Sequence, residues 1–276
     1  MSTFEATVRA VVRETWDTVS LWLETGSPHA FRAGQFLSLD PHRQDFTRGR
    51  ARELEALKGR KEKPRAYSLA SAPHEELVAI TVKEEPAGEF PSLMSPGLSR
   101  SGVGEKLFCT GYAGLFTLPE DLGDGAHVVH LCAGSGIVPS FAILKDALHR
   151  GVDARHTLLY SNKRWEDVIF RDALTELETR HPGSLRVVHA LTRDARAPAP
   201  ARREVRPGRI DEATLRANVP DLENAWFYVC GPSVPIHEAR AARERGEKPA
   251  PRFLESMRAL VLSLGIPKER LFTEGW

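Results

Sequence analysis

Alternating apolar and polar positions dominate the first part of the chain. Val8, Ala10 and Val12 form one alternating set, and residues 19–23 and 36–39 repeat the period. A period of two places successive side chains on opposite faces of a half-buried strand. Residues 66–69, 77–83 and 105–110 continue the series, and residues 92–99 favour a short helix. Residues 1–120 are therefore predicted to form a small antiparallel β-barrel.

The pattern changes after a Pro-, Gly- and Asp-rich stretch at residues 118–125. Continuous apolar runs (VVHLCA, HTLLYS, LRVVHAL and AWFYVCG) follow, as expected for parallel strands buried on both faces. Helical segments at 139–149, 167–180 and 252–264 lie between or after them. Residues 125–276 are therefore predicted to form an α/β domain, with a parallel sheet and helices on both faces.

One segment of the first part fits neither pattern. Residues 41–64 interrupt the strands with helix-forming, charged residues and few apolar anchors, which predicts an exposed helical insertion or a mobile loop. Residues 41–65 hold nine Lys or Arg and four Asp or Glu, a charge of +5. The whole chain carries only +1, so the remainder is −4.

Composition excludes several classes of protein. The 276 residues are 41% hydrophobic and 27% charged, which is typical of a globular protein, and the balanced charge argues against general nucleic-acid binding. Three scattered cysteines without a CxxC pair argue against a disulfide scaffold, a zinc site or an iron–sulfur cluster, so no metal is expected. No long apolar span or signal-peptide layout is visible, and a cytoplasmic location is expected.

The first candidate for ligand binding is CAGSGIVPS, residues 132–140, a weak signal when taken alone. It leaves a buried strand and opens a helix, where free N–H groups and the positive end of the helix dipole favour a phosphate. Gly134 and Gly136 allow close approach of a ligand, while Pro139 stands where a third glycine is common. The alternative is an ordinary tight turn.

Polar and basic residues end the next two strands. Ser161 and Lys163 stand where an NAD site usually has a carboxylate, and Thr192 and Arg193 end the following strand, before a loop that contains Arg203. Arginine side chains suit a 2′-phosphate, although each of these residues can equally be a solvated loop charge. Cys230 ends a later strand, either as a ligand contact or as a small buried hydrophobe.

Taken in order, the motifs resemble one family. GQF (34–36), RAYSLAS (65–71), GEFPS (88–92), GYAGLF (111–116), GSGIVP (134–139), YVCGP (228–232) and EGW (274–276) resemble the ferredoxin–NADP(+) reductase family. That family joins an FAD-binding barrel to a pyridine-nucleotide domain, and the resemblance covers nearly the whole chain. The chain departs from the family pattern in Tyr112, which replaces a proline, and in the insertion at 41–64.

The resemblance implies roles for residues of the barrel. Arg65 would pair with the FAD pyrophosphate, Tyr67 would lie against the isoalloxazine or ribityl region, and Ser68 would face flavin N5. Gly88 and Ser92 would bind the pyrophosphate, with a spacing one residue longer than usual.

It also implies roles in the second domain. Cys230 would lie beside the nicotinamide, Trp276 would cover the exposed face of the flavin, and Glu274 would assist proton movement near N5. Thr192 and Arg193 would bind the 2′-phosphate. Without the resemblance, FTEGW reads as a frayed end.

The expected site residues fall into two groups. The catalytic set is Ser68, Cys230, Glu274 and Trp276. The cofactor-binding set is Arg65, Tyr67, Ser68, Lys83, Gly88, Ser92, Gly134, Ser135, Gly136, Pro139, Ser161, Lys163, Thr192, Arg193, Arg203, Gly231 and Trp276.

The resemblance implies an FAD-dependent oxidoreductase. It would move a hydride between NADPH and FAD and pass single electrons to a separate ferredoxin or flavodoxin. NADP is favoured, with NAD possible. One alternative is the NAD(P)H-dependent reductase component of a multicomponent oxygenase, and another is a non-catalytic redox sensor. The basic insertion is either a solvated loop or a docking surface for an acidic carrier.

Overall fold

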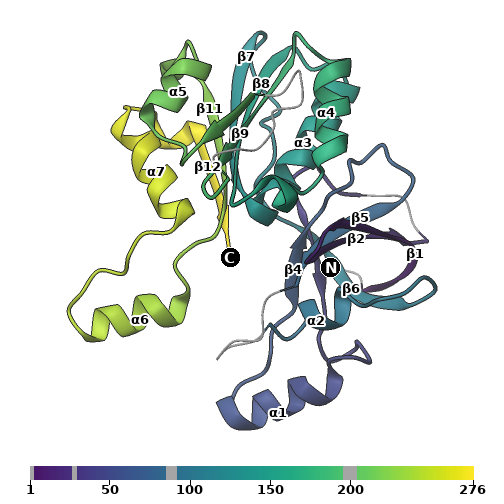
Figure 1. Cartoon of the computed structure of the whole chain (residues 1–276). Helices are drawn as coiled ribbons and strands as arrows, with labels where there is room; N and C mark the ends of the chain where they lie inside the picture. The colour runs from purple at the N-terminus through teal and green to yellow at the C-terminus, as the bar shows by residue number, and fades with distance from the viewer. Residues whose placement is uncertain (1–2, 27–29, 85–91, 195–203) are drawn as a thin grey trace. The chain divides into compact units, whose positions relative to one another are not determined.

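The computed structural model describes residues 3–26, 30–84, 92–194 and 204–276. Two compact units emerge from the contacts within the chain (Figure 1). Unit 1 consists of Met1–Leu118 and Phe141–Asp146, and unit 2 of Pro119–Ser140 and Ala147–Trp276. Among the described residues, no helix is both long and apolar enough to span a membrane.

Unit 1 is built on an antiparallel sheet of six strands in the order β4-β3-β6-β1-β2-β5. An isolated bridge between Leu69 and Ile80 joins the chain just after edge strand β4 to edge strand β5, so that the sheet curls into a barrel. Apolar side chains such as Val8, Leu21 and Leu37 fill its interior, as the alternation predicts. The strands are β1 (Phe4–Thr15), β2 (Thr18–Glu24), β3 (Phe36–Leu39), β4 (Arg65–Ser68), β5 (Val78–Lys83) and β6 (Lys106–Ala113).

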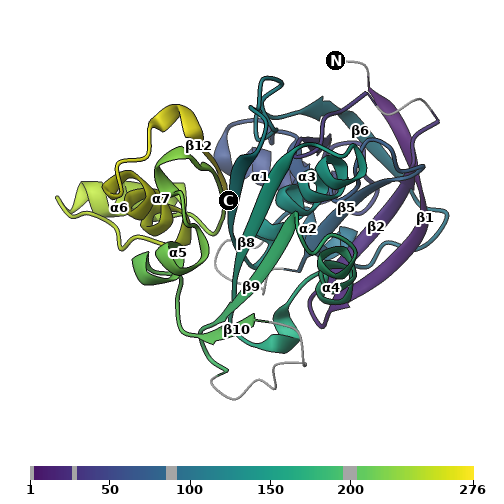
Figure 2. The ribbon, with the colours of Figure 1, turned by 90° about the horizontal axis from the view of Figure 1, so that it is seen from above.

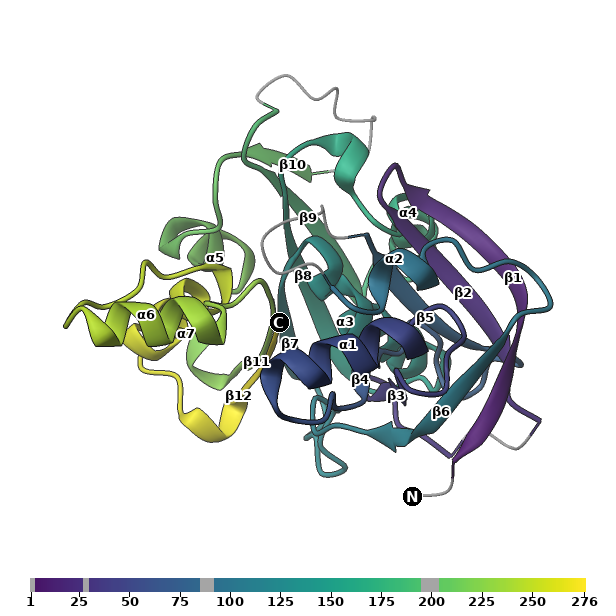
Figure 3. The same ribbon diagram turned by 90° about the horizontal axis from the view of Figure 1, so that it is seen from below.

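Two helices accompany this barrel. The insertion forms helix α1 (Arg48–Lys58), so the helical alternative was right and the mobile-loop alternative was wrong. The short helix expected at 92–99 is α2 (Ser95–Leu98). Both helices lie at the same end of unit 1, with α1 in dark blue (Figures 1 and 3).

Unit 2 contains a parallel sheet in the order β10-β9-β8-β7-β11-β12. Helices α3 and α4 cover one face and α5 and α7 the other, which confirms the predicted α/β architecture (Figure 2). The strands are β7 (Ala126–Ala133), β8 (Ala154–Asn162), β9 (Leu185–Leu191), β10 (Glu204–Pro207), β11 (Trp226–Gly231) and β12 (Leu271–Gly275). The helices are α3 (Ile137–His149), α4 (Arg171–Arg180), α5 (Glu212–Asn218), α6 (Ile236–Glu244) and α7 (Phe253–Ser263).

The structure corrects the sequence reading at both edges of this sheet. Strands β10 and β12 were not predicted, and the frayed-end reading of FTEGW was wrong because residues 271–275 pair with β11. Helix α4 begins four residues later than expected. Residues 165–167 instead form a 3₁₀ turn, in which the Asp167 side chain accepts a hydrogen bond from Arg164 N at 3.1 Å.

A pair of buried histidines stands inside the parallel sheet. His130 Nε2 and His156 Nδ1 are 3.2 Å apart, and the His130 ring also lies near Tyr228. The second ring nitrogen of each histidine is buried without a partner among the described residues. Burial lowers the pKa of His156 to about 4 and that of His130 well below its usual value. Both imidazoles are therefore neutral in the folded protein near pH 7.

This pair predicts a loss of stability in mild acid. Below pH 6.5 the unfolded chain takes up a proton at His156, whereas the folded protein does so only near pH 4. The free energy of unfolding should thus fall as the pH drops through this window, by about 3 kcal/mol for His156. Urea unfolding across the window should show a shallower dependence in His156→Leu than in the exposed control His149→Leu. Equal slopes would contradict the prediction.

Candidate functional site

The order of the parallel strands reverses between β7 and β11. From β7 the chain builds outward through β8, β9 and β10, then returns to add β11 and β12 on the other side. Ligands of open α/β sheets bind at such a switch point, outside the carboxyl ends of the strands. Cys132 on β7 lies opposite Cys230 on β11, and Cys230 lies opposite Glu274 on β12. The structure thus brings Cys132, Cys230 and Glu274 together at this edge.

The glycine-rich turn packs directly against the end of β11. Residues Gly134–Gly136 form a 3₁₀ turn that leads into α3, and Tyr160 Oη donates a hydrogen bond to Gly134 O at 2.9 Å. A Cβ atom on Gly136 would stand only 2.2 Å from Cys230 O. Only glycine permits this approach without a backbone shift. Ser135 lies in the same turn and Pro139 in the first turn of α3, as predicted.

Cys230 is a buried, neutral thiol. Burial raises its pKa well above the ordinary value, and the neighbouring Cys132 and Glu274 raise it further. A thiol in this state is a poor nucleophile. Cys230 is therefore suited to packing beside a ring and unsuited to covalent catalysis. Gly231 follows it at the end of β11.

The last strand is fixed to the segment that follows Cys230. Ser233 N and Ser233 Oγ donate hydrogen bonds to Trp276 O at 3.1 and 2.9 Å. These bonds and the pairing of β12 with β11 hold Glu274 and Trp276 beside the switch point of unit 2. The Trp276 residue nevertheless remains 48% exposed, which leaves its indole available to a ligand.

The polar strand ends at β8 and β9 are linked through the backbone. Thr192 N donates to Asn162 O at 3.0 Å, and Arg193 N donates to Lys163 O at 2.8 Å. The structure thus places Ser161, Lys163, Thr192 and Arg193 along one edge of the sheet, whereas Arg203 lies outside the described residues.

Asn162 is a residue that the sequence analysis missed. Its side-chain nitrogen is buried without a partner among the described residues, at the edge that holds Lys163 and Thr192. An unpaired buried donor is costly unless a ligand or water supplies an acceptor. Its position directly after a buried strand was the only sequence signal that pointed to it.

The predicted flavin residues of unit 1 occupy strand β4. Ser68 pairs with Phe36 and Tyr67 with Leu37 of β3, and Tyr67 packs against the barrel core. The Arg65 guanidinium contacts one carboxylate oxygen of Glu62 and donates to Lys63 O at 2.6 Å. Arg65 is thus positioned by the insertion.

The other predicted residues of unit 1 are placed differently. Lys83 forms an ion pair with the buried Asp17 at 3.0 Å, so its ammonium group already has a structural role in the barrel. Ser92 Oγ accepts a hydrogen bond from Ser95 N at 3.3 Å, where α2 begins. Gly88 lies outside the described residues. The assignment of Lys83, Gly88 and Ser92 to cofactor binding stays a prediction.

Comparison with known proteins agrees with this architecture. Residues 131–240 match the family model described as an oxidoreductase NAD-binding domain. The solved ferredoxin NADP+ reductase of Neisseria gonorrhoeae, with bound FAD and NADP, superposes with a TM-score of 0.71 at 21% identity, covering 100% of this chain and 99% of that one. The chain has the fold of the ferredoxin–NADP(+) reductase family. This confirms the predicted resemblance and fold class.

Two relatives are similar in sequence to this chain, and both are described as ferredoxin reductase components of 3-ketosteroid-9-alpha-monooxygenase. The protein from Mycobacterium tuberculosis is 32% identical over 187 residues, which cover 67% of this chain and 47% of that protein. The protein from Rhodococcus rhodochrous is 29% identical over 273 residues, which cover 97% of this chain and 63% of that protein. The chain therefore spans less than two thirds of either relative.

The close approach at Gly136 predicts an intolerant position in this reductase fold. Gly136→Ala forces a methyl group against Cys230 O and should reduce the free energy of unfolding by about 1–3 kcal/mol, as over-packing does. Gly183→Ala is the matched control, because a Cβ atom there meets nothing within 4 Å. Urea unfolding measures both. A Gly136→Ala protein as stable as the control would contradict the close approach.

Proposed function

We propose that this protein is an FAD-dependent reductase, which moves a hydride between NADPH and FAD and passes single electrons to a separate ferredoxin- or flavodoxin-type carrier. The observation that carries the proposal is the switch point of unit 2, where the glycine-rich turn, Cys230, Glu274 and Trp276 meet. The relatives and the structural neighbour, described as ferredoxin reductases or reductase components, support the same chemistry.

The residues fit the two cofactors. In the proposal, residues 1–120 hold FAD, with Arg65 on the pyrophosphate and Ser68 near flavin N5. Residues 125–276 hold the nicotinamide nucleotide, with Gly134 and Gly136 around its pyrophosphate. Gly136 lets this turn approach Cys230 O, which keeps the turn close to the end of β11. When bound, FAD accepts two electrons as a hydride and releases them one at a time.

The protein's own contribution is positioning. Hydride transfer between two rings needs alignment more than acid–base help, so fixed packing accounts for much of the rate. Cys230 offers a neutral, buried contact for the nicotinamide. Glu274, held by pairing with Cys230, is the proposed acid that exchanges protons near N5. Trp276 is the proposed gate over the flavin.

Nucleotide selectivity is proposed to reside at the ends of β8 and β9. Lys163 and Arg193 are positive, and the backbone bond between them keeps the two strand ends together. Two cations and the Thr192 hydroxyl suit a 2′-phosphate, whereas an NAD-selective site usually places a carboxylate there. NADPH is thus favoured, with NADH as a slower substrate.

A second candidate is the NAD(P)H-dependent reductase component of a multicomponent oxygenase. The specific observation in its favour is the description of the Mycobacterium tuberculosis relative as a ferredoxin reductase component of a monooxygenase. The electron acceptor would then be the ferredoxin or the oxygenase component itself. A cytoplasmic location, predicted from the sequence, is part of both proposals.

The direct test is anaerobic reduction of the FAD-loaded protein. NADPH should bleach the visible flavin absorption, and added cytochrome c should be reduced rapidly only when a suitable carrier is present. A screen of ferredoxins, flavodoxins and purified oxygenase components against NADPH and NADH separates the two candidates. A protein that cannot take up FAD, or whose flavin NADPH does not reduce, would rule out both.

The gate predicts a specific effect of Trp276→Ala. The substitution keeps the carbonyl oxygen that Ser233 binds, so β12 remains anchored while the indole is lost. Nicotinamide nucleotides should bind several-fold more tightly and the preference for NADPH over NADH should fall, because the nicotinamide no longer competes with the indole. Trp16→Ala removes another exposed indole as a control. Unchanged dissociation constants and unchanged preference would contradict the gate.

A further inference from the structure

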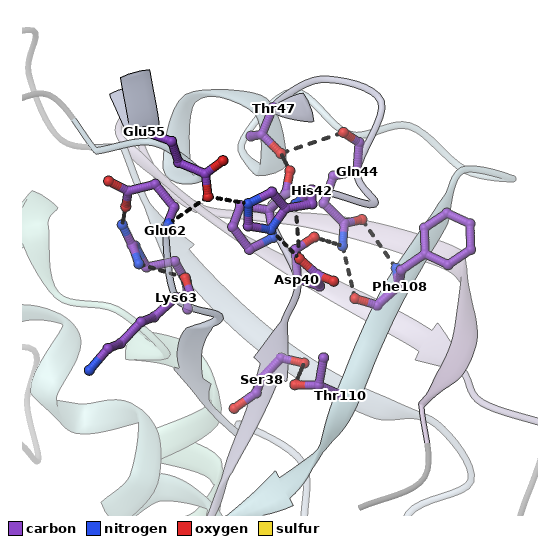
Figure 4. A network of polar contacts seen from close by, with 12 residues as sticks. Ser38, Asp40, His42, Gln44, Thr47, Glu55, Glu62, Lys63, Phe108 and Thr110 are labelled. Atoms are coloured by element: carbon purple, nitrogen blue, oxygen red, sulfur yellow. Dashed lines mark hydrogen bonds and ion pairs between the residues drawn. The ribbon is translucent and has the colours of Figure 1, made fainter. Parts of the chain in front are cut away.

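The insertion at residues 41–64 has no counterpart in the family pattern, yet it is firmly attached to the barrel. His42 Nδ1 lies 2.9 Å from Asp40 Oδ1, and His42 Nε2 lies 2.7 Å from Glu55 Oε1 on α1 (Figure 4). The same Glu55 oxygen accepts a hydrogen bond from Glu62 N at 2.8 Å. These contacts tie both ends of the insertion to helix α1. Glu55 and Asp40 raise the pKa of His42, which favours its charged form in this network.

A second set of bonds joins the insertion to strand β6. Gln44 Nε2 donates to Phe108 O at 2.8 Å and Phe108 N donates to Gln44 Oε1 at 3.1 Å, as a neighbouring strand would (Figure 4). Thr47 Oγ1, just before α1, donates to Pro41 O at 2.6 Å. The position of α1 is therefore set by bonds to the barrel.

Between α1 and α2 lies a cavity of about 610 Å³. This volume falls within the range of about 300–1,000 Å³ that is typical of small-molecule sites. The insertion contributes Phe46, Leu54 and Lys58 to its lining, and α2 with its flanks contributes Leu93, Pro96 and Gly97.

The two walls meet where Phe46 packs on Gly97. A Cβ atom on Gly97 would stand 2.0 Å from the Phe46 ring, so a larger residue there would displace the ring. The insertion thus packs against α2 at one side of the cavity, where both Phe46 and Gly97 line it.

One buried carboxylate connects this cavity to Arg65. Lys58, in the lining, binds Glu62 Oε1 at 2.8 Å, and Arg65 contacts the other oxygen of the same carboxylate. The Glu62 side chain is only 6% exposed. Arg65 is the residue proposed to pair with the FAD pyrophosphate, so the cavity lies next to the diphosphate end of the proposed flavin site.

The linear structure of FAD then identifies the occupant. FAD runs from the isoalloxazine ring through ribityl and diphosphate to adenosine. Ser68 and Arg65 are three residues apart on β4, or about 10 Å, and are assigned to the ring end and the diphosphate end. An extended FAD would place its adenosine beyond Arg65, away from Ser68, which is the direction in which the chain leads back to Glu62 and α1.

We propose that helix α1 and helix α2 form the pocket for the adenosine half of FAD, and that the insertion retains the cofactor. The inference rests on the proposed function. The apolar surfaces of Phe46, Leu54 and Leu93 suit an adenine ring. Lys58 would hold the phosphate next to the ribose, while Arg50 and Arg100 add positive charge and Glu105 one negative charge to the lining.

The test compares flavins that share the ring but differ in the adenosine. Dissociation constants of the apoprotein for FAD and FMN are measured by quenching of flavin fluorescence. Leu54→Asp, in the cavity, should weaken FAD at least tenfold and leave FMN within twofold, because FMN lacks adenosine. Leu57→Asp is the matched control on the same helix, since Leu57 is 79% exposed and does not line the cavity. It should leave both flavins unchanged.

A second pair of variants keeps the test decisive if Leu54→Asp fails to fold. Arg50→Ser, in the lining, should weaken FAD more than FMN, and Arg52→Ser, outside the lining, should not. Equal losses for FAD and FMN, or no loss with either cavity variant, would overturn the inference. So would cavity variants that slow reduction of a carrier in a salt-dependent way while FAD affinity stays intact. Failure of the wild-type protein to bind either flavin would instead refute the proposed function.

Discussion

The close approach of Gly136 to the end of β11 is the constraint on which the unit 2 site depends. A βα turn at the switch point would stand away from β11 if residue 136 carried a side chain, because its Cβ atom would lie 2.2 Å from Cys230 O. With glycine there, the turn, Cys230 and the start of α3 share one small volume. The same strand end fixes Glu274 through β12, and Ser233 then fixes Trp276. The end of β11 therefore brings together four of the predicted site residues, Gly136, Cys230, Glu274 and Trp276.

Burial keeps the cysteines at this site and the histidines of the sheet uncharged. Removal of Cys230 and Cys132 from water keeps both thiols neutral, with the pKa of Cys132 raised to about 12. The buried histidines of the sheet are neutral for the same reason. The interior of unit 2 thus supplies shape and a low-dielectric surface, while Lys163 and Arg193 stand at the strand ends where the proposal places a phosphate. This division suits a reaction in which the protein aligns two cofactor rings.

The sequence predicted the elements that are marked by a regular spacing of apolar residues. It missed those that form only through contacts with distant parts of the chain. The strand at 36–39 appears with the predicted bounds because its alternation faces a real core. Strand β12 has only five residues, and it is a strand because its backbone pairs with β11. Helix α1 has few apolar anchors and is held by hydrogen bonds of His42, Gln44 and Glu55, so no periodicity could decide between helix and loop. Motif order predicted the site residues, but coordinates were needed to show the ion pair of Lys83 with Asp17 and the Asn162 side-chain nitrogen, buried without a partner among the described residues.

The positive charge of the insertion is partly engaged in contacts within the protein. The ion pairs of Arg48 with Asp45, Arg50 with Glu53 and Lys58 with Glu62 leave the net charge of residues 41–65 at +5, with His42 counted as neutral, since the count of acids and bases is unchanged. A negatively charged diphosphate bound beside Arg65 would offset part of it. An acidic carrier would then meet the electrostatic field of the FAD-loaded protein. That field is weaker than a net charge of +5 implies, and salt reduces its range further. Binding of the cofactor acts at contact distance, where screening by salt is weakest. It also accounts for the cavity between α1 and α2, which the docking of a carrier does not explain.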